Sequence, residues 1–194
     1  MIEENEFVAA IAIGNRGEFA PVLMQSMHEF RREMFVQRLG WSLPLLEGHE
    51  RDQYDRDDTV YFVAVDSADS VTACARLLPT TGAYMLPDLF PQLLGTTTAP
   101  HHSTIWELSR FAANVRTTRE GRVLSLSRPT FELLSSVLDF ARARDIEHLV
   151  LVTSIAIERL LLRSSFEVHR MAAPAYVNGS LCVALLISTL AVPE

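Results

Sequence analysis

The chain has 194 residues, enough for one domain with a sizeable hydrophobic core. Its composition, 48% hydrophobic and 21% charged, is typical of a globular protein and excludes a disordered or fibrous one. A formal charge of −7 argues against a general nucleic-acid-binding surface. All 17 basic residues are arginines, which excludes chemistry that needs lysine, such as a Schiff base or a P-loop.

Cysteine usage and the N-terminus point to one compartment. Cys74 and Cys182 lie in apolar runs and are predicted to be reduced thiols. The N-terminus is acidic where a secretory signal would be basic, and no apolar stretch reaches the roughly 18 residues that a membrane span needs. His101 and His102 lack a third ligand at a useful spacing, so we expect no metal site. We predict one domain, 1–194, in the cytoplasm and not in a membrane.

The first part of the chain alternates β-rich and helical patterns. An apolar run at 7–13 predicts a strand that turn residues close. Apolar residues at spacings of three and four predict a helix over 18–38. Residues 40–58, rich in Pro, Gly and charge, predict a long loop, and such loops are usually functional. Two β-rich runs, 60–66 and 71–78, predict a hairpin.

The second part continues in the same way. A short helix is expected at 85–94, followed after a loop by a strand at 104–112. Helical spacing predicts a helix over 127–144, with a serine and a proline suited to its first turn. A β-rich run at 148–153 and a helix at 155–163 follow.

Two more strand candidates, 166–171 and 181–189, close the chain. The resulting order is β-α-β-β-α-β-α-β-α-β-β. This order predicts an α/β sandwich in which helices cover both faces of one mixed sheet.

Charge is concentrated around 30–41 and 50–58. Charge runs of this kind are usually solvated faces. Here Arg31 and Phe35 lie four residues apart on one helical face, with Trp41 just beyond the expected helix end. We therefore expect a guanidinium and two aromatic rings to converge.

Three further ionisable residues lie inside apolar, β-like runs. Arg76, Glu107 and Arg110 would each cost several kcal/mol if buried without a partner, so they must be paired or functional. A purely structural ion-pair network is the alternative. Residues three apart point to opposite faces of a regular strand, so we predict a β-bulge between Glu107 and Arg110. In a regular strand, one of the two would be structural, and we would assign that role to Arg110.

Four sequence blocks resemble one family in order and separation. They are FRREMFVQRLGW, ERDQYD, ARLLPTTGAYMLPDLFP and WELSRFA, which cover about 30–112, with weaker similarity to about 170. The chain resembles the acyl-homoserine-lactone synthases, the autoinducer synthases of bacterial quorum sensing. The resemblance implies a three-layer α/β/α sandwich similar to the GCN5-related N-acyltransferases.

The resemblance also implies a reaction. An acyl group would pass from an acyl carrier protein thioester to the amine of S-adenosylmethionine, and lactone closure would release methylthioadenosine. No cofactor is implied, because S-adenosylmethionine is a substrate. The family's charged positions fall on Arg31, Glu50, Asp52, Asp55, Arg76, Glu107 and Arg110. Its aromatic positions fall on Phe35, Trp41 and Phe90, and we add Arg76 and Phe111 as substrate-binding residues.

The amine must lose a proton before it attacks a thioester, so the site needs a base. Glu107 is the candidate, and Asp52 or Asp55 acting through water is the alternative. Arg31 or Arg110 would orient the substrate carboxylate for lactone closure, which proximity promotes.

Aromatic rings would hold the other end of this substrate. Phe35 and Trp41 would pack on its adenosine or sulfonium group.

The second half of the chain should determine which acyl chain and which acyl donor the protein uses. A hydroxyl at the position that Thr153 resembles favours a 3-oxo chain in the family. Arg159 and Arg163, four apart on one helical face with Arg170 nearby, would meet an acidic carrier protein, although a solvated face is an equal alternative. A set of apolar residues could line a tunnel for the acyl chain, although such residues more commonly belong to the hydrophobic core. These are Leu126, Leu133, Leu149, Leu151 and Ile155.

Two other functions stay open at this point. A coenzyme A-dependent acyltransferase for another amine would show a glycine-rich loop that binds phosphate. Residues 116–122 contain a single glycine, Gly121, and do not match that motif. A binding module without activity would not need Glu107, Asp52 and Arg31.

Overall fold

The computed structural model describes residues 10–43, 45–46, 48–113, 128–163 and 166–190. Its main helices are α1 (Pro21–Arg31), α2 (Met85–Leu89), α3 (Arg128–Arg142) and α4 (Ile155–Arg163). Eight strands form the central sheet: β1 (Ala10–Gly14), β4 (Val60–Val65), β5 (Val71–Pro79), β6 (Ile105–Ala113), β7 (His148–Ser154), β8 (Val168–Arg170), β9 (Ala175–Val177) and β10 (Ser180–Ser188).

The sheet is mixed, as the element order predicts. Its strands lie in the order β1-β4-β5-β6-β7-β10-β8, and β9 pairs with β10. The β6–β7 pair is parallel, whereas the other pairs of this sheet are antiparallel. Buried side chains of α1 and α2 pack on one face, and those of α3 and α4 on the other. The predicted three-layer α/β/α architecture is confirmed.

Strand β5 shows how alternation builds the two faces. Ala75 and Leu77 belong to the core under α3, whereas Cys74 and Leu78 belong to the clusters under α1 and α2. Because successive side chains point to opposite faces, Arg76 lies on the same face as Cys74 and Leu78. A fully buried arginine is thereby placed between two apolar clusters.

The first helix differs from its prediction at both ends. It begins at Pro21, because proline suits the first helical turn, where no N–H is needed. The carboxylate of Glu18 instead accepts a hydrogen bond from the Asn15 backbone N–H in a turn. The expected last turns form a π-helix, η1 (Arg32–Arg38), in which the backbone N–H of Leu39 bonds to the carbonyl of Met34.

Other differences are short elements. The predicted loop at 40–58 holds a small hairpin of β2 (Leu45–Leu46) and β3 (His49–Glu50). The helix expected at 85–94 breaks at Phe90 and resumes as the 3₁₀ turn η2 (Pro91–Leu93). Strand β9 was not predicted, because three residues carry no measurable period. The first three residues of the strand predicted at 7–13, and the serine expected to cap α3, lie outside the described residues.

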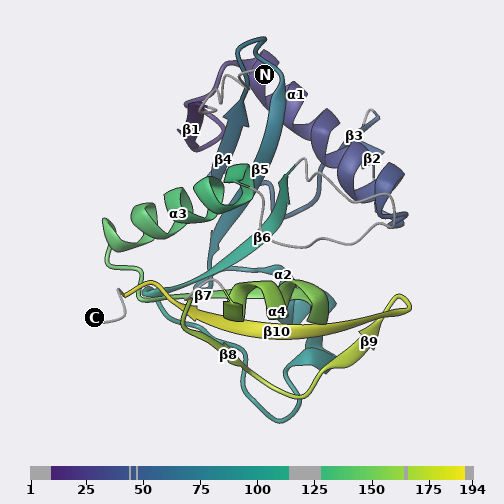
Figure 1. The fold of residues 1–194 in the computed structure, drawn as a ribbon, viewed down its shortest axis with the longest axis vertical. Coiled ribbons are helices and arrows are strands. Elements are labelled where there is room, and N and C mark those ends of the chain that lie inside the picture. The colour runs from purple at the N-terminus through teal and green to yellow at the C-terminus, as the bar shows by residue number, and fades with distance from the viewer. Residues whose placement is uncertain (1–9, 44, 47, 114–127, 164–165, 191–194) are drawn as a thin grey trace, which may run out of the picture.

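Strands β6 and β7 separate partway along their length. They pair only from Ile105 with His148 to Glu107 with Val150. Beyond this point β6 follows β5 and β7 follows β10, as the diverging arrows in Figure 1 show. Glu107 is therefore the last residue of β6 that pairs with β7.

No helix in the described part of the chain has both the length and the apolar character to cross a membrane. Both cysteines are free thiols, as predicted, and Cys74 is buried.

Candidate active site

A β-bulge in β6 creates the site. β5 and β6 pair at Cys74 with Ala112 and at Arg76 with Ser109, so β6 has one more residue than β5 in this interval. Arg110 takes up the extra residue with a φ of 48°, which is uncommon outside glycine. The bulge breaks the alternation of side chains along the strand.

A bulge therefore brings Glu107 and Arg110 to one face, as predicted, but it lies at Arg110 and Phe111 rather than between Glu107 and Arg110. Arg110 turns to the face that also carries Glu107 and Ser109, where it meets the carboxylate of Glu50. Phe111 points to the opposite face and packs against the core under α3. The structure therefore does not bring Phe111 together with the charged residues.

Six charged side chains form a closed ring on the α1 and α2 face, which we call the ion-pair ring. Its members are Arg31, Arg76, Arg110, Glu50, Asp52 and Asp55. Each side chain is at most 4% exposed. The three positive and three negative charges cancel, as a buried cluster requires.

Every carboxylate of the ring bridges two guanidiniums. Glu50 joins Arg31, at 2.5 Å, to Arg110, at 2.9 Å. Asp52 joins Arg110, at 2.8 Å, to Arg76, at 2.6 Å. Asp55 closes the ring between Arg76, at 3.0 Å, and Arg31, at 2.7 Å.

The ring strongly favours the charged state of Asp55. Although burial alone would disfavour a carboxylate, Arg31 and Arg76 hold the pKa of Asp55 well below its usual range. Burial lowers the pKa of Arg110, while Glu50 and Asp52 oppose that effect. Asp55 is a fixed anion and a poor proton acceptor.

Residues that the sequence analysis did not select support the ring. The hydroxyl of Tyr61 donates to Asp55 at 3.1 Å. Nδ1 of His28 lies 3.0 Å from the carbonyl oxygen of Glu50, and because a carbonyl only accepts, this nitrogen carries the proton. Burial, and then Arg31, lower the pKa of His28. The position of His28, three residues before Arg31, is a signal that could have found it.

Glu107 lies beside the ring but is not part of it. Its two carboxylate oxygens accept backbone hydrogen bonds from Met85, at 2.9 Å, and Leu86, at 2.8 Å, at the start of α2. The residue is 1% exposed, and burial raises its pKa to about 7, against the effect of these N–H groups and the nearby arginines. Glu107 can therefore gain or lose a proton near neutral pH.

Two aromatic rings stack at the end of η1. Phe35 and Trp41 have ring centroids 5.3 Å apart, with planes inclined by 28°. The cation above Phe35 is Arg110, 5.5 Å from the ring centroid. A guanidinium and the two rings thus come together, but this guanidinium is that of Arg110, whereas Arg31 pairs with Glu50 and Asp55 in the ion-pair ring.

The remaining predicted substrate contacts are dispersed. Phe90, at the end of α2, packs half-buried against the apolar cluster under that helix. Thr153 of β7 is half-buried and lies opposite Val183 of β10. The expected tunnel residues pack in or against the core under α3 and α4, apart from Leu126, which lies outside the described residues. These are Leu133, Leu149, Leu151 and Ile155.

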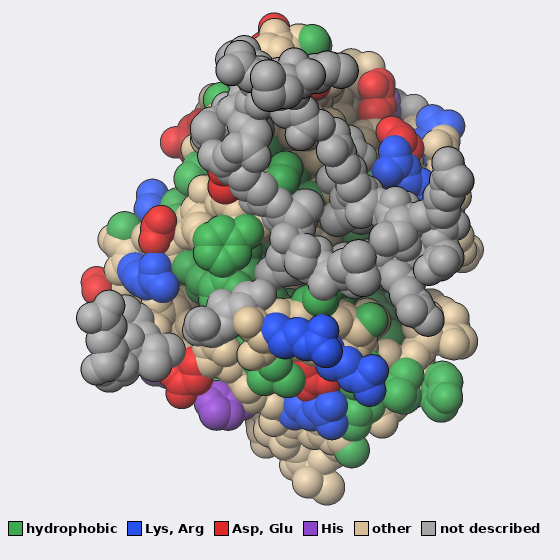
Figure 2. All heavy atoms as spheres, in the orientation of Figure 1, with side chains coloured by type: hydrophobic (Ala, Val, Ile, Leu, Met, Phe, Trp, Pro, Cys, Tyr) green, Lys and Arg blue, Asp and Glu red, His purple; other side chains and the backbone are tan. Residues whose placement is uncertain are grey.

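The arginines expected to dock a carrier protein share one surface. Arg159 and Arg163 are exposed on α4. Arg170, on β8, pairs with Glu158 of α4, with Nη2 and Oε2 2.7 Å apart. Figure 2 shows basic side chains gathered over α4 and β8 around an acidic one.

No group of three or more His, Cys, Asp or Glu side chains among the described residues is placed to hold a metal ion. The Nδ1 atom of His101 lies 3.0 Å from the carbonyl of Thr80, and that of His102 lies 2.9 Å from the hydroxyl of Thr104.

Known proteins are similar to this chain in sequence and in fold. The family model for autoinducer synthases matches residues 18–190. An acyl-homoserine-lactone synthase from Acinetobacter nosocomialis is 38% identical over 181 residues, 91% of this chain and 98% of the relative. The crystal structure of the AHL synthase LasI has a TM-score of 0.84 at 34% identity, covering 95% of this chain and 92% of LasI.

Two further structures carry ligands. TofI, in a ternary complex with an inhibitor and MTA, has a TM-score of 0.78 at 36% identity and covers 92% of this chain and 91% of its own. BjaI, described as a CoA-dependent acyl-homoserine lactone synthase with SAM and isopentyl-CoA, has a TM-score of 0.83. At 24% identity, over 94% of this chain and 84% of BjaI, this likeness concerns the fold alone.

Proposed function

Because the chain belongs to the autoinducer synthase family as an acyl-homoserine-lactone synthase, we propose that its acyl donor is an acyl carrier protein thioester and its acceptor is S-adenosylmethionine. The amine attacks the thioester carbonyl carbon, the carbon–sulfur bond breaks, and the carrier leaves as a thiol. The carboxylate oxygen then attacks the γ-carbon of the same substrate. The bond to the sulfonium breaks, and neutral methylthioadenosine leaves with an acyl lactone as the other product.

The observation that carries this proposal is the carboxylate of Glu107. An ammonium group cannot attack a thioester, so a base must take its proton. A base with a pKa of about 7 matches that task at neutral pH, and Glu107 has this pKa because it is buried. Its position where β6 leaves β7 supports a role between an acyl chain and an amine.

The alternative bases are less suited. Each of Asp52 and Asp55 bridges two arginines, so protonating either would break two ion pairs. The ring acts instead as a rigid wall of the site, with both Arg31 and Arg110 already occupied. Phe35 and Trp41 present stacked rings suited to the adenosine or sulfonium group.

The structure of TofI with MTA supports S-adenosylmethionine as the acceptor, since methylthioadenosine is the product that the lactone step would release. The exposed pair Arg159 and Arg163 supports an acidic carrier protein as the donor. Coenzyme A is the competing donor, because BjaI is described as CoA-dependent. The 3-oxo or unsubstituted state of the acyl chain would depend on the hydroxyl of Thr153.

The proposed reaction changes no oxidation state, so its two steps need no redox cofactor. S-adenosylmethionine is consumed rather than regenerated. We place the reaction in the cytoplasm, with the free thiols Cys74 and Cys182 as support for a reducing compartment.

Mass spectrometry of the reaction products tests the proposal. The purified protein is mixed with S-adenosylmethionine and carrier thioesters of different lengths, plain and 3-oxo, with matched coenzyme A thioesters in parallel. Methylthioadenosine with one dominant acyl lactone, formed faster from carrier thioesters, is the expected result. A preference for coenzyme A thioesters would overturn the donor, and folded protein that releases no methylthioadenosine with any donor would overturn the acceptor.

A further inference from the structure

One arginine next to the ion-pair ring has no side-chain partner within the described part of the chain. Arg51 follows β3 and is only partly exposed. It makes no hydrogen bond or ion pair through its guanidinium with any residue that the structure describes. Its neighbours Glu50 and Asp52 both belong to the ring, so Arg51 is a cation beside a cluster that is already neutral.

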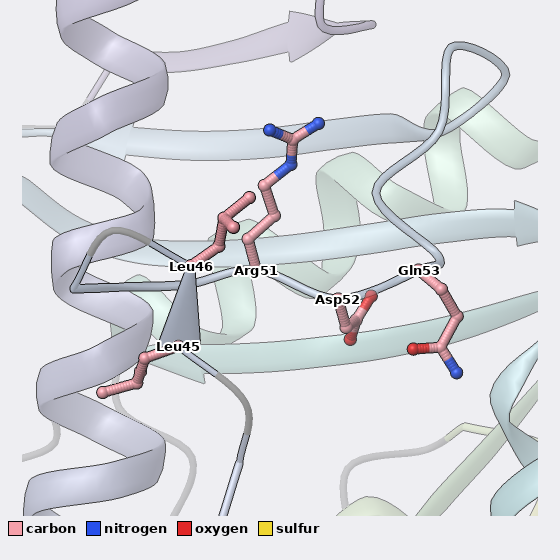
Figure 3. A pocket seen from close by; sticks show the side chains of 5 residues that line it. All are labelled: Leu45, Leu46, Arg51, Asp52 and Gln53. Carbon is pink, nitrogen blue, oxygen red and sulfur yellow. The ribbon is translucent and has the colours of Figure 1, made fainter.

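Arg51 borders a cavity of about 390 Å³. The other lining residues are Leu45, Leu46, Asp52 and Gln53. Figure 3 shows Arg51 and Leu46 extending side by side to one side of the loop, whereas Leu45 and Gln53 extend to the other. Because Asp52 belongs to both, the cavity adjoins the ion-pair ring.

These groups favour a ligand of one chemical type. Both carboxylate oxygens of Asp52 are held by Arg76 and Arg110, which leaves Arg51 and the exposed amide of Gln53 as the polar groups of the cavity. Leu46, exposed and alongside Arg51, offers an apolar surface. A small molecule that joins a carboxylate to an apolar arm fits this combination, since a guanidinium binds a carboxylate through two parallel hydrogen bonds.

We propose that Arg51 binds the carboxylate of the methionyl end of S-adenosylmethionine. This inference rests on the proposed function and replaces Arg31 and Arg110 in that role. An incoming carboxylate would have to displace Glu50, Asp52 or Asp55 from either of those arginines, and breaking a buried ion pair is costly. Arg51 requires no such exchange.

The position of Arg51 also suits the second chemical step. The carboxylate must leave its anchor to attack the γ-carbon. A partly exposed guanidinium on a loop residue holds an anion less tightly than a buried one, because water screens the pair. Arg51 therefore orients the carboxylate during acyl transfer and releases it for lactone closure.

Binding measurements with two nucleosides test the role of Arg51. Titration calorimetry compares S-adenosylmethionine with its decarboxylated analogue, which lacks only the carboxylate. The proteins are the wild type, Arg51→Gln, Arg51→Lys and the control Arg16→Gln, which removes an exposed charge on the turn after β1. Thermal unfolding verifies that each variant is folded.

The wild type should bind S-adenosylmethionine about 10- to 100-fold more tightly than the analogue, as expected for a hydrogen-bonded ion pair. Arg51→Gln should bring this ratio close to one and leave the affinity for the analogue unchanged. Arg51→Lys should keep part of the ratio, and Arg16→Gln all of it. The KM for the acyl donor should stay at the wild-type value in Arg51→Gln.

Three outcomes would overturn the proposal. Arg51→Gln could keep the wild-type ratio, or it could lose affinity equally for both nucleosides, which would indicate a structural role. A rise in the KM for the acyl donor would instead place a phosphate of that donor at Arg51. If the wild type binds neither nucleoside, the proposed function itself fails, and this result is distinguishable because no variant is needed to see it.

Discussion

The backbone N–H of Met85 donates a hydrogen bond to Oε2 of Glu107 at 2.9 Å, so α2 begins on the carboxylate of β6. The sulfur of the same methionine lies 3.1 Å from Nη2 of Arg76. Met85 thus contacts the proposed base through its backbone and the ion-pair ring through its side chain. The first turn of α2 sets the distance between the two.

Replacement of Glu107 should remove the pH dependence of the reaction. The base form is the deprotonated carboxylate, so kcat/KM should rise about tenfold per pH unit below pH 7 and level off above it. Glu107→Gln should lower kcat by about 10²- to 10⁴-fold and abolish this rise. Steady-state kinetics between pH 5.5 and 9 measure both effects.

A glutamine at position 107 retains one acceptor for the N–H groups of α2, and unchanged S-adenosylmethionine binding would show that the site is intact. Full activity of Glu107→Gln with the wild-type pH profile would assign the proton to another group.

Breaking the ion-pair ring should unfold the protein more readily. Asp55→Asn leaves Arg31 and Arg76 without a shared anion in a dry environment, which should cost about 3–5 kcal/mol. The matched control is Asp58→Asn, which breaks an exposed pair with Arg56 and should cost less than about 1 kcal/mol. Urea unfolding followed by circular dichroism measures both, and equal losses in the two variants would argue against a stabilising ring.

His28 should make stability depend on mildly acidic pH. Burial and the neighbouring Arg31 lower its pKa in the folded state, so below pH 6.5 the unfolded chain binds this proton more readily. The contribution is fully present above the unfolded pKa and is lost as the pH falls below it. The free energy of unfolding should therefore drop more between pH 7.5 and 5.5 in the wild type than in His28→Asn, whose amide can still donate to Glu50. Parallel pH curves for the two proteins would contradict this.

Charge reversal on α4 should weaken the use of a carrier protein. Arg159→Glu with Arg163→Glu should raise the KM for an acyl carrier protein thioester about tenfold at low salt, because both charges lie on the rim of the proposed contact. The KM for S-adenosylmethionine should not change, and each single reversal, Arg159→Glu or Arg163→Glu, is compared with Arg16→Glu as the charge-matched control. An equal rise in the control would show a general charge effect.

Thr153 should influence the oxidation state of the acyl chain. Its hydroxyl has no hydrogen-bond partner among the described residues, so it is available to a 3-oxo group. Thr153→Val, of nearly the same size, should shift the product ratio about 3- to 10-fold toward unsubstituted chains. Competition between plain and 3-oxo donors of one length measures the ratio, and an unchanged ratio would assign the preference elsewhere.

The layers and the bulge could be predicted from local rules. In a regular strand, two charged residues three positions apart would point to opposite faces, so one of them would enter the apolar core. One extra residue in the strand brings both to the same face, as Arg110 shows. The partners of these charges could not be predicted. Glu50 meets Arg110, 60 residues away, only because the path after η1 and the hairpin of β2 and β3 bring it there.

The backbone partners of Glu107 were equally hidden. Hydrogen bonds from Met85 and Leu86 do not depend on their side chains, so no residue type at positions 85 and 86 reveals them. The unpaired state of Arg51 was hidden for the opposite reason. Arg51 is one of seven charged residues in the 50–58 segment, and only the three-dimensional pairing shows that its guanidinium makes no ion pair with a described residue.

The extra residue in β6 makes chain length a determinant of the site. Removal of Phe111 would restore the alternation of the strand and turn the charge at position 110 into the apolar core under α3. Every residue type needed for the reaction would still be present. Deleting a single residue from this strand would therefore be far more damaging than substituting one. A relative that keeps these residue types but not their spacing would have lost the site.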